Sequence, residues 1–189
     1  GFLLVSRVVG ACLLAFSQLG RIRILRWASQ LYIAFFRGTP MLVQLFLIYF
    51  GLPALCRDLG LPFSLDRFVA AVLALSLNGA AYMAETLRGG IESIEASQWD
   101  AADALAMNPI ERMRFVIFPQ ALRRALPPLA NEGITLIKDT SLAAVIGFDE
   151  LFRQGQLVVA TSYRAFEVYL AVALVYLVMT TTASLLFKQ

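Results

Sequence analysis

Long apolar runs alternate with short polar segments along nearly the whole chain. A helix needs about 20 apolar residues to cross the hydrocarbon core of a bilayer, and five runs approach or exceed that length. We predict spans at Phe2–Leu19, Met41–Leu55, Phe68–Leu87, Ala121–Phe148 and Tyr169–Phe187. The pattern therefore predicts an all-α membrane protein with about five transmembrane helices.

Two segments between these runs differ from simple loops. Residues 21–36 mix arginines with aromatic residues, which is typical of an amphipathic helix at the membrane interface. Residues 149–167 are polar and are predicted to lie outside the membrane, on the external side. No linker or internal repeat divides the chain, so a single domain over residues 1–189 is expected.

Composition agrees with a membrane protein. Of the 189 residues, 59% are hydrophobic and 15% are charged, and the mean hydropathy is +0.72. A soluble domain carries about 25% charged residues. The net charge of +3 is small, so the positions of the basic residues are more informative than their number.

Basic residues gather in two polar segments, and cytoplasmic loops carry an excess of such residues. The two groups are Arg21, Arg23, Arg26 and Arg37, and Arg88, Arg112, Arg114, Arg123 and Arg124. Five spans then place the N-terminus outside and the C-terminus in the cytoplasm, with Lys188 at the cytoplasmic end of the last span. Nucleic-acid binding is not expected, because the basic residues alternate with spans.

The residue inventory argues against an enzyme. The sequence contains no histidine, which removes His-based triads and zinc motifs, and it contains no glycine-rich phosphate-binding loop. Cys12 and Cys56 lack the spacing of a metal site or a disulfide framework. Transport driven by ATP would need a separate nucleotide-binding chain. The chain begins with Gly1 rather than Met, and we expect the first helix to begin before it, with no signal peptide.

Polar residues interrupt the third span on one side. Asn78, Tyr82 and Glu85 lie at positions i, i+4 and i+7, so they share one face of a helix. Such residues either hydrogen-bond to neighbouring helices or line a polar path through the membrane. The sequence leaves both interpretations open.

The fourth span is the most polar of the five. Pro127-Pro128 and Gly133 are predicted to interrupt it, and it contains Asn131, Glu132, Lys138 and Asp139. The Lys138–Asp139 pair could neutralise itself locally. With Thr140 and Ser141 it could instead form a polar patch beside a helix break, as transporters allow where the backbone lines a cavity.

A polar segment from Glu95 to Pro119 separates the third and fourth spans. Trp99, Ala102, Leu105 and Ala106 recur at helical spacing, which predicts a short helix with one small apolar face. Residues 108–111 read Asn-Pro-Ile-Glu, a helix start with a capping side chain and a proline in the first turn. The segment is either a solvated loop or a surface that docks onto a partner.

Residues across the chain resemble a known transporter family. The central segment keeps the spacing of the EAA loop of binding-protein-dependent ABC importer permeases, whose pattern is Glu-Ala-Ala, three residues, Gly, nine residues, Ile, any residue, Leu-Pro. Here Asp100, Ala106, Val116 and Phe118 replace its Glu, Gly, Ile and Leu. Four further stretches resemble the polar amino acid subfamily: residues 37–40 (RGTP), 49–53 (YFGLP), 78–85 (NGAAYMAE) and 138–142 (KDTSL).

The resemblance implies a type I importer permease fold in a bacterial cytoplasmic membrane. Its coupling loop would cover residues 91–118, with coupling residues Trp99, Asp100, Ala101, Ala102, Leu105 and Ala106. The small alanines would allow close approach to an ATPase subunit, which alone would use ATP and Mg²⁺, so this chain would bind no cofactor. A second permease chain and an extracytoplasmic solute-binding protein would complete the importer.

The same resemblance implies a polar amino acid as substrate. The candidate residues of the substrate path are Asn78, Tyr82, Glu85, Lys138, Asp139, Thr140 and Ser141. Two alternative functions assign different roles to these polar residues. An ATP-independent transporter or channel would use Glu85, Lys138 and Asp139 as ion sites, and a structural scaffold would use them only to join helices.

Overall fold

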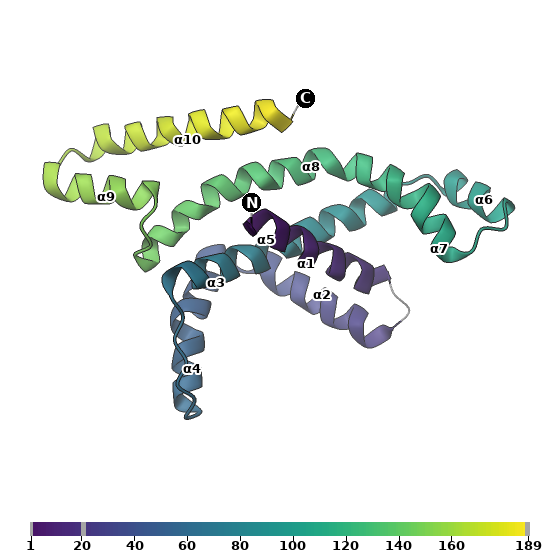
Figure 1. The fold of residues 1–189 in the computed structure, drawn as a ribbon, viewed down its shortest axis with the longest axis horizontal. Coiled ribbons are helices and arrows are strands. Elements are labelled where there is room, and N and C mark those ends of the chain that lie inside the picture. Colours follow the sequence, from purple (N-terminus) through teal and green to yellow (C-terminus); the bar gives the residue numbers. More distant parts are fainter. Residues whose placement is uncertain (1, 20–21, 188–189) are drawn as a thin grey trace.

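The computed structural model describes residues 2–19 and 22–187, and these residues are mainly helical, with no strand among them (Figure 1). The α-helices are α1 (Phe2–Leu19), α2 (Arg23–Gly38), α3 (Met41–Phe46), α4 (Leu52–Asp58), α5 (Arg67–Glu92), α6 (Ala96–Ala104), α7 (Pro109–Glu111), α8 (Phe118–Asp139), α9 (Leu151–Ser162) and α10 (Ala165–Phe187). Two π-helices, η1 (Leu47–Gly51) and η2 (Arg112–Ile117), and a 3₁₀-helix, η3 (Thr140–Ile146), connect them. The predicted all-α fold class is confirmed. Gly1, Arg21 and Lys188, used above for the chain start and the topology, lie outside the described residues.

Helix α5 is the centre of the structure, because α1, α2, α3 and α8 all pack against it (Figure 1). The side chain of Asp66 caps its first turn by accepting a 2.8 Å hydrogen bond from the Phe68 backbone N–H. Its buried positions are mostly small residues, which let neighbouring helix backbones come close. They include Ala70, Ala71, Ala74, Gly79, Ala80, Ala81 and Ala84.

One of these contacts leaves no space for a methyl group. A Cβ atom added at Gly79 would lie 2.2 Å from Nε of Arg7, a side chain of α1 that is itself buried. The substitution Gly79→Ala should therefore displace Arg7 and lower stability by about 1–3 kcal/mol. We expect a lower midpoint of thermal unfolding for the detergent-solubilised protein.

Gly89→Ala is the matched control for that prediction. Gly89 lies in the same helix, and a Cβ atom there would meet nothing within 4 Å. Alanine should raise the midpoint at this position because it is the better helix former. Equal effects of the two substitutions on the unfolding midpoint would show that the contact with Arg7 does not exclude a side chain at position 79.

Three helical stretches have the length and apolar composition to cross a membrane: residues 41–58, 67–92 and 165–187. The apolar part of α1, Leu3–Ala15, is shorter than such a span. Helix α8 carries Arg123, Arg124, Glu132, Lys138 and Asp139 and is too polar to meet the same criterion. The first and fourth predicted spans therefore correspond to α1 and α8, which are not uniformly apolar. Both helices pack against α5.

The predicted interruption of the fourth span is wrong. Helix α8 continues through Pro127, Pro128 and Gly133; both prolines lie on its exposed side, whereas its buried residues, Ala121 and Ala125, come earlier in the helix.

Helix α9 occupies most of the segment 149–167, which was predicted to be external. Its N-terminus is capped by Glu150, which accepts hydrogen bonds from the backbone N–H groups of Phe152 and Arg153.

The amphipathic helix predicted over residues 21–36 is confirmed as α2. Ser29, Ile33 and Phe36 form its buried side, whereas Ile24 and Trp27 are exposed. Helix α2 ends at Gly38, and the extended backbone of Thr39 and Pro40 separates it from α3. This break lies against α5 and helps to form the candidate site described next.

Candidate functional site

A polar pocket of about 310 Å³ lies between the α2–α3 break, α5 and α8. Its lining residues are Thr39, Pro40, Met41, Asn78, Tyr82, Glu132, Thr135 and Asp139. The α5 pair is four residues apart, and the three α8 residues lie at i, i+3 and i+7, so each helix contributes one face. The structure thus brings together Asn78, Tyr82 and Asp139 of the predicted substrate path.

Asn78 also fixes the break in the backbone. Its amide donates to the side chain of Gln44 at 2.9 Å and to the carbonyl of Phe36 at 3.3 Å. Gln44 is almost fully buried and donates in turn to the carbonyl and the hydroxyl of Thr39. Gln44 was missed in the sequence, although a glutamine within the apolar run 41–55 was a usable signal. Asn78 therefore joins helices as well as lining the pocket.

The two acidic residues of the pocket have no direct hydrogen-bond or ion-pair partner among the described residues. Glu132 and Asp139 are partly buried, and neither makes a hydrogen bond or an ion pair within the described chain. Carboxylates in such a position favour a cationic group of a ligand, because burying an unpaired charge is costly. Glu132 was noted in the sequence as a polar residue of its span but not assigned to the path.

The other residues of the predicted 138–141 patch lie elsewhere. Lys138 is exposed and does not line the pocket. The hydroxyl of Thr140 donates to the carbonyl of Ile137, and that of Ser141 donates to the carbonyl of Lys138. These hydroxyls bond to their own helix at the point where α8 tightens into η3.

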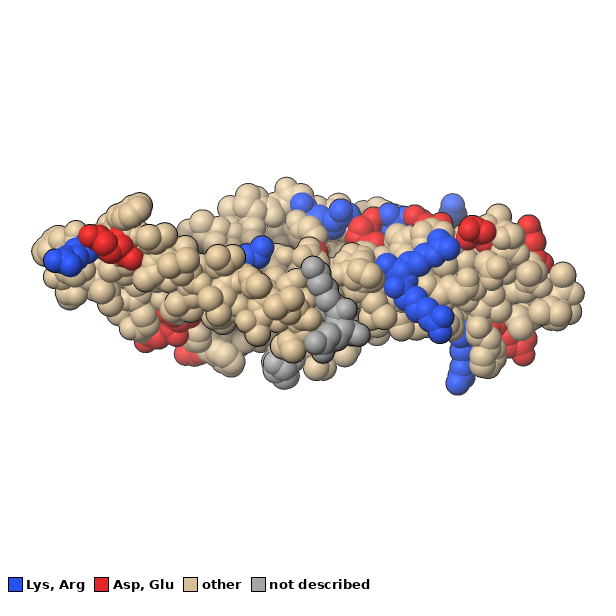
Figure 2. Space-filling model, turned by 90° about the horizontal axis from the view of Figure 1, so that it is seen from above, with Lys and Arg blue, Asp and Glu red and all other residues tan. Residues whose placement is uncertain are grey.

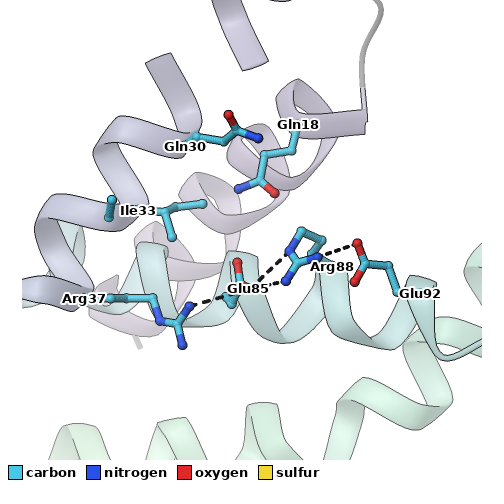
Figure 3. Close-up of a pocket in the computed structure, with 8 residues that line it drawn as sticks. Gln18, Gln30, Ile33, Arg37, Glu85, Arg88 and Glu92 are labelled. Carbon is cyan, nitrogen blue, oxygen red and sulfur yellow. Dashed lines mark hydrogen bonds and ion pairs between the residues drawn. The ribbon is translucent and has the colours of Figure 1, made fainter. Parts of the chain in front are cut away.

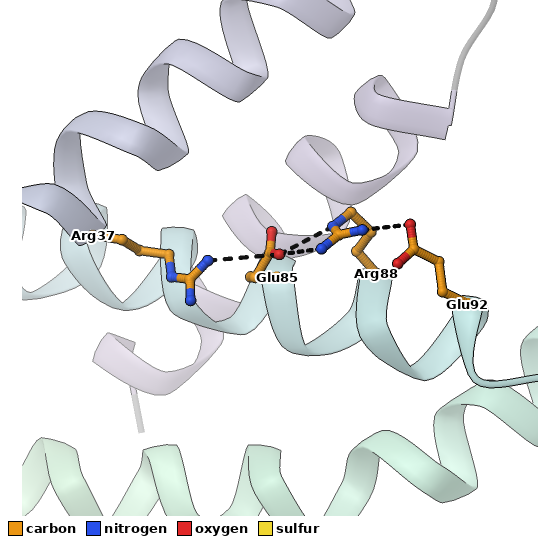
Figure 4. Close-up of polar contacts among 4 residues, drawn as sticks. All are labelled: Arg37, Glu85, Arg88 and Glu92. Carbon is orange, nitrogen blue, oxygen red and sulfur yellow. Dashed lines mark hydrogen bonds and ion pairs between the residues drawn. The ribbon is translucent and has the colours of Figure 1, made fainter.

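Glu85 belongs to a separate ion network (Figure 4). It pairs with Arg88, which also pairs with Glu92, and its carboxylate lies 3.6 Å from the guanidinium of Arg37. These four residues line a second cavity of about 400 Å³ together with Gln18, Gln30, Ile33 and Ala34 (Figure 3). Arg37 connects the two cavities, because its guanidinium also lies 5.7 Å from the ring centre of Tyr82.

Helix α6 and η2 form the second functional element. Figure 2 shows charged side chains gathered over the half of the molecule that carries α6 and α7. Within this region the predicted coupling residues divide into two sets. Ala102 is buried and Trp99 packs with the core cluster of Ile91, Ile94, Ile117 and Ala121. Asp100, Ala101, Leu105 and Ala106 are exposed.

Local contacts hold this element in shape. The guanidinium of Arg112 stacks on Trp99 at 5.3 Å and pairs with Asp103. The helix start predicted at residues 108–111 is confirmed as a capping box, in which Asn108 and Glu111 bond to each other's backbone N–H groups. These contacts fix the position of α6, whose other side stays exposed.

Ala106 ends α6 in a backbone conformation that favours glycine. Its φ is 52°, its N–H bonds to the carbonyl of Asp103, and the N–H of Met107 bonds to the carbonyl of Ala102. These two bonds define a Schellman motif, in which the left-handed residue is usually glycine. The glycine of the EAA pattern aligns with this position, so its role here is conformational.

Ala106→Gly should stabilise this turn. A left-handed L-residue costs roughly 1–2 kcal/mol, and the added freedom of glycine in the unfolded chain offsets about half of that gain. We expect about threefold slower hydrogen exchange of the Met107 amide. Ala104→Gly, inside the helix, should instead speed exchange, and faster exchange in Ala106→Gly as well would contradict the assignment.

A family model described as the binding-protein-dependent transport system inner membrane component matches residues 8–189. The chain belongs to this family. It is a multi-pass membrane component of a transport system and not an enzyme, so the ATPase and the binding protein are separate partners. This membership favours the importer over the ATP-independent and scaffold alternatives.

Individual relatives agree with the family. The chain is 41% identical over 183 residues to the probable amino-acid permease protein YxeN of Bacillus subtilis (strain 168), covering 97% of this chain and 80% of that protein. It is 45% identical over 161 residues to the glutamine transport system permease protein GlnP of Escherichia coli (strain K12), covering 85% and 72%.

Solved structures show the same fold. A crystal structure of an amino acid ABC transporter with histidines matches with a TM-score of 0.90 and 38% identity, covering 98% of this chain and 84% of that one. The MetNI methionine ABC transporter, in an inward-facing conformation, matches with a TM-score of 0.73 and 20% identity, covering 99% and 85%. The type I permease fold predicted for this inner-membrane component is therefore confirmed.

Within the described residues, no three His, Cys, Asp or Glu side chains lie together as metal ligands would. The polar pocket offers two acidic groups, one amide and three hydroxyls, and the α6 surface offers an exposed helix end.

Proposed function

We propose that this inner-membrane component moves polar amino acids through the pocket between α5 and α8. The observation that carries the proposal is the pair of carboxylates, Glu132 and Asp139, which make no ion pair among the described residues and lie beside the hydroxyl groups of Tyr82 and Thr135. An ammonium group pairs with the former, and a carboxylate accepts hydrogen bonds from the latter. The relatives whose names specify amino acids or glutamine support this substrate class.

The remaining candidate residues would serve the path outside the pocket. Glu85 lies in the neighbouring cavity, and Lys138, Thr140 and Ser141 lie at the end of α8. A substrate that leaves the pocket past Arg37 would meet Glu85 next. We assign Glu85, Lys138, Thr140 and Ser141 to the passage of the substrate, and Asn78, Tyr82 and Asp139 to its binding.

The exposed side of α6 would dock onto a separate ATPase subunit, which binds ATP and Mg²⁺. Asp100, Ala101, Leu105 and Ala106 form the docking surface. Trp99 faces the opposite way, into the cluster that includes Ile91 of α5 and Ala121 of α8, and Ala102 is also buried. Movement of the ATPase would therefore reach both helices that line the pocket.

The proposed orientation places α6 in the cytoplasm. Helices α1 and α10 both run toward the end of the molecule that carries α6, so the N-terminus would lie outside and the C-terminus inside (Figure 1). A solute-binding protein would approach from the opposite side. A second permease chain, identical or related, would enclose the path.

The test is ATP hydrolysis by the complete importer in lipid, with binding protein loaded with each amino acid in turn. We expect hydrolysis to rise with one group of polar amino acids. Solute movement with unchanged hydrolysis would contradict ATP-driven import and restore the ATP-independent alternative.

A further inference from the structure

Arg7 is the most deeply buried charged side chain of the described residues, at 1% exposure. It extends from α1 across α5, where its Nε donates a 2.8 Å hydrogen bond to the carbonyl of Leu75. The absence of a side chain at Gly79 provides the space for its guanidinium. A charge in this position is costly in a membrane protein and indicates a function.

The hydrogen bond to Leu75 does not satisfy the guanidinium. Its Nη2 atom is buried and has no hydrogen-bond partner within the part of the chain that the structure describes. The carboxylates whose charges act on Arg7 are those of Asp139 and Glu132, the two acidic residues of the pocket. Arg7 therefore lies behind the pocket, within electrostatic range of both acids but outside its lining.

Attachment of α1 does not require this charge. The hydroxyls of Ser6 and Ser76 share a 2.8 Å hydrogen bond, and Gly10 of α1 packs closely against Ala80 of α5. Small residues and a hydroxyl pair are sufficient to hold two membrane helices together. A leucine or methionine at position 7 would have served packing without the cost of desolvating a cation.

Arg7 balances the charges around the pocket. Glu132 and Asp139 bring two negative charges, and Arg7 and Lys138, whose charges act on them, bring two positive ones, so the four groups sum to about zero. An amino acid with a neutral side chain is a zwitterion of net charge zero and matches this balance. A second positive charge on the ligand would be left without a counter-charge.

We propose that Arg7 is a specificity-determining residue that sets the net charge of the α5–α8 pocket and so favours amino acids with a neutral side chain over cationic ones. The proposal rests on the proposed function of the pocket. Arg7 acts through Glu132 and Asp139 and touches no substrate, so it is a positioning residue. Removing its charge should shift the preference of the pocket toward cationic amino acids.

The experiment measures equilibrium binding of radiolabelled L-glutamine and L-arginine to the purified permease–ATPase complex without binding protein. Leaving out the binding protein removes its own selectivity from the measurement. In Arg7→Gln, the affinity for arginine relative to glutamine should rise about tenfold, since one charge is lost from a site of low dielectric. Arg7→Lys keeps the charge and should keep the wild-type ratio.

A double variant gives a second test of the role of Arg7, which is needed if Arg7→Gln alone fails to assemble. The double substitution Arg7→Gln with Glu132→Gln restores the net charge of the pocket and should restore the wild-type ratio. An unchanged ratio in Arg7→Gln, or a ratio in the double variant equal to that of Glu132→Gln alone, would overturn the role of Arg7.

Failure of the underlying function gives a different result. If the pocket is not the substrate site, Asp139→Asn and Glu132→Gln leave the binding of both amino acids unchanged. In that case the proposal for Arg7 falls together with the proposed function. If the acidic variants alter binding while Arg7→Gln does not, only the proposal for Arg7 falls.

Discussion

Asp139→Asn should reduce amino acid uptake by about 100-fold. Asp139 ends α8 and lines the pocket, and no residue of the described chain pairs with its carboxylate. Asparagine keeps the shape of the side chain but removes the charge that would hold the substrate ammonium. The loss of one partner of a desolvated charge pair costs about 2–5 kcal/mol, which corresponds to factors of roughly 30 to 4,000 and includes the 100-fold loss expected here.

The measurement is uptake of radiolabelled amino acid into proteoliposomes that contain the complete importer and ATP. Asp58→Asn is the matched control, because Asp58 is exposed at the end of α4, away from the pocket. It should leave uptake unchanged. Uptake by Asp139→Asn within twofold of the wild type would remove this carboxylate from the substrate site.

The sequence correctly indicated which residues share a polar helical face, but it did not indicate which cavity each of them lines. Asn78, Tyr82 and Glu85 share a face by spacing, yet the first two line one pocket and Glu85 lines the other. The separation depends on Arg37 of α2, which stacks on Tyr82 and pairs with Glu85. The periodicity of one helix contains no information about a side chain that another helix places beside it.

Residues 138–141 show a related limit. The sequence groups four adjacent polar residues, but adjacent residues on a helix point in different directions. Only Asp139 reaches the pocket, where it meets Thr135 from one turn earlier and Glu132 from two turns earlier. Counting back from Asp139 by seven and by four residues was the signal that would have found them.

The fold was predicted well where a local rule decides and less well where packing decides. Apolar runs and the capping residues at 108–111 define helices by themselves. Pro127 and Pro128 would end an isolated helix, yet α8 continues through them because it packs along α5 and α10. Helix α9 has a polar sequence, and its stability depends on contacts with α10, including a hydrogen bond from Tyr176 to its capping residue Glu150.

The coupling helix combines both situations. Spacing predicted that Trp99, Ala102, Leu105 and Ala106 share an apolar face. The helix instead ends at Ala104, and Leu105 and the left-handed Ala106 beyond it are exposed, whereas Trp99 packs against the core and Ala102 is buried. A left-handed residue at the helix end changes the direction of the chain, so helical spacing no longer applies beyond it.

Leu105→Asp should uncouple the ATPase from the permease. Leu105 is 72% exposed at the end of α6, so its side chain is available to a partner. Burial of a leucine at an interface contributes about 1.5–3 kcal/mol, and a carboxylate in its place must also be desolvated. We expect at least about 100-fold weaker association of the ATPase subunit and loss of substrate-stimulated ATP hydrolysis.

Leu59→Asp separates this effect from a general response to a new surface charge. Leu59 is 67% exposed and directly follows α4, a helix that lies apart from α6 in Figure 1. It should leave ATPase association unchanged, and both variants should still bind amino acid in the α5–α8 pocket. Equal loss of ATPase association in both variants would mean that the α6 end is not the docking surface. Retained substrate binding in Leu105→Asp, together with lost hydrolysis, would show that the pocket and the coupling helix are two separate sites, with the core around Ile91, Ile117 and Ala121 between them.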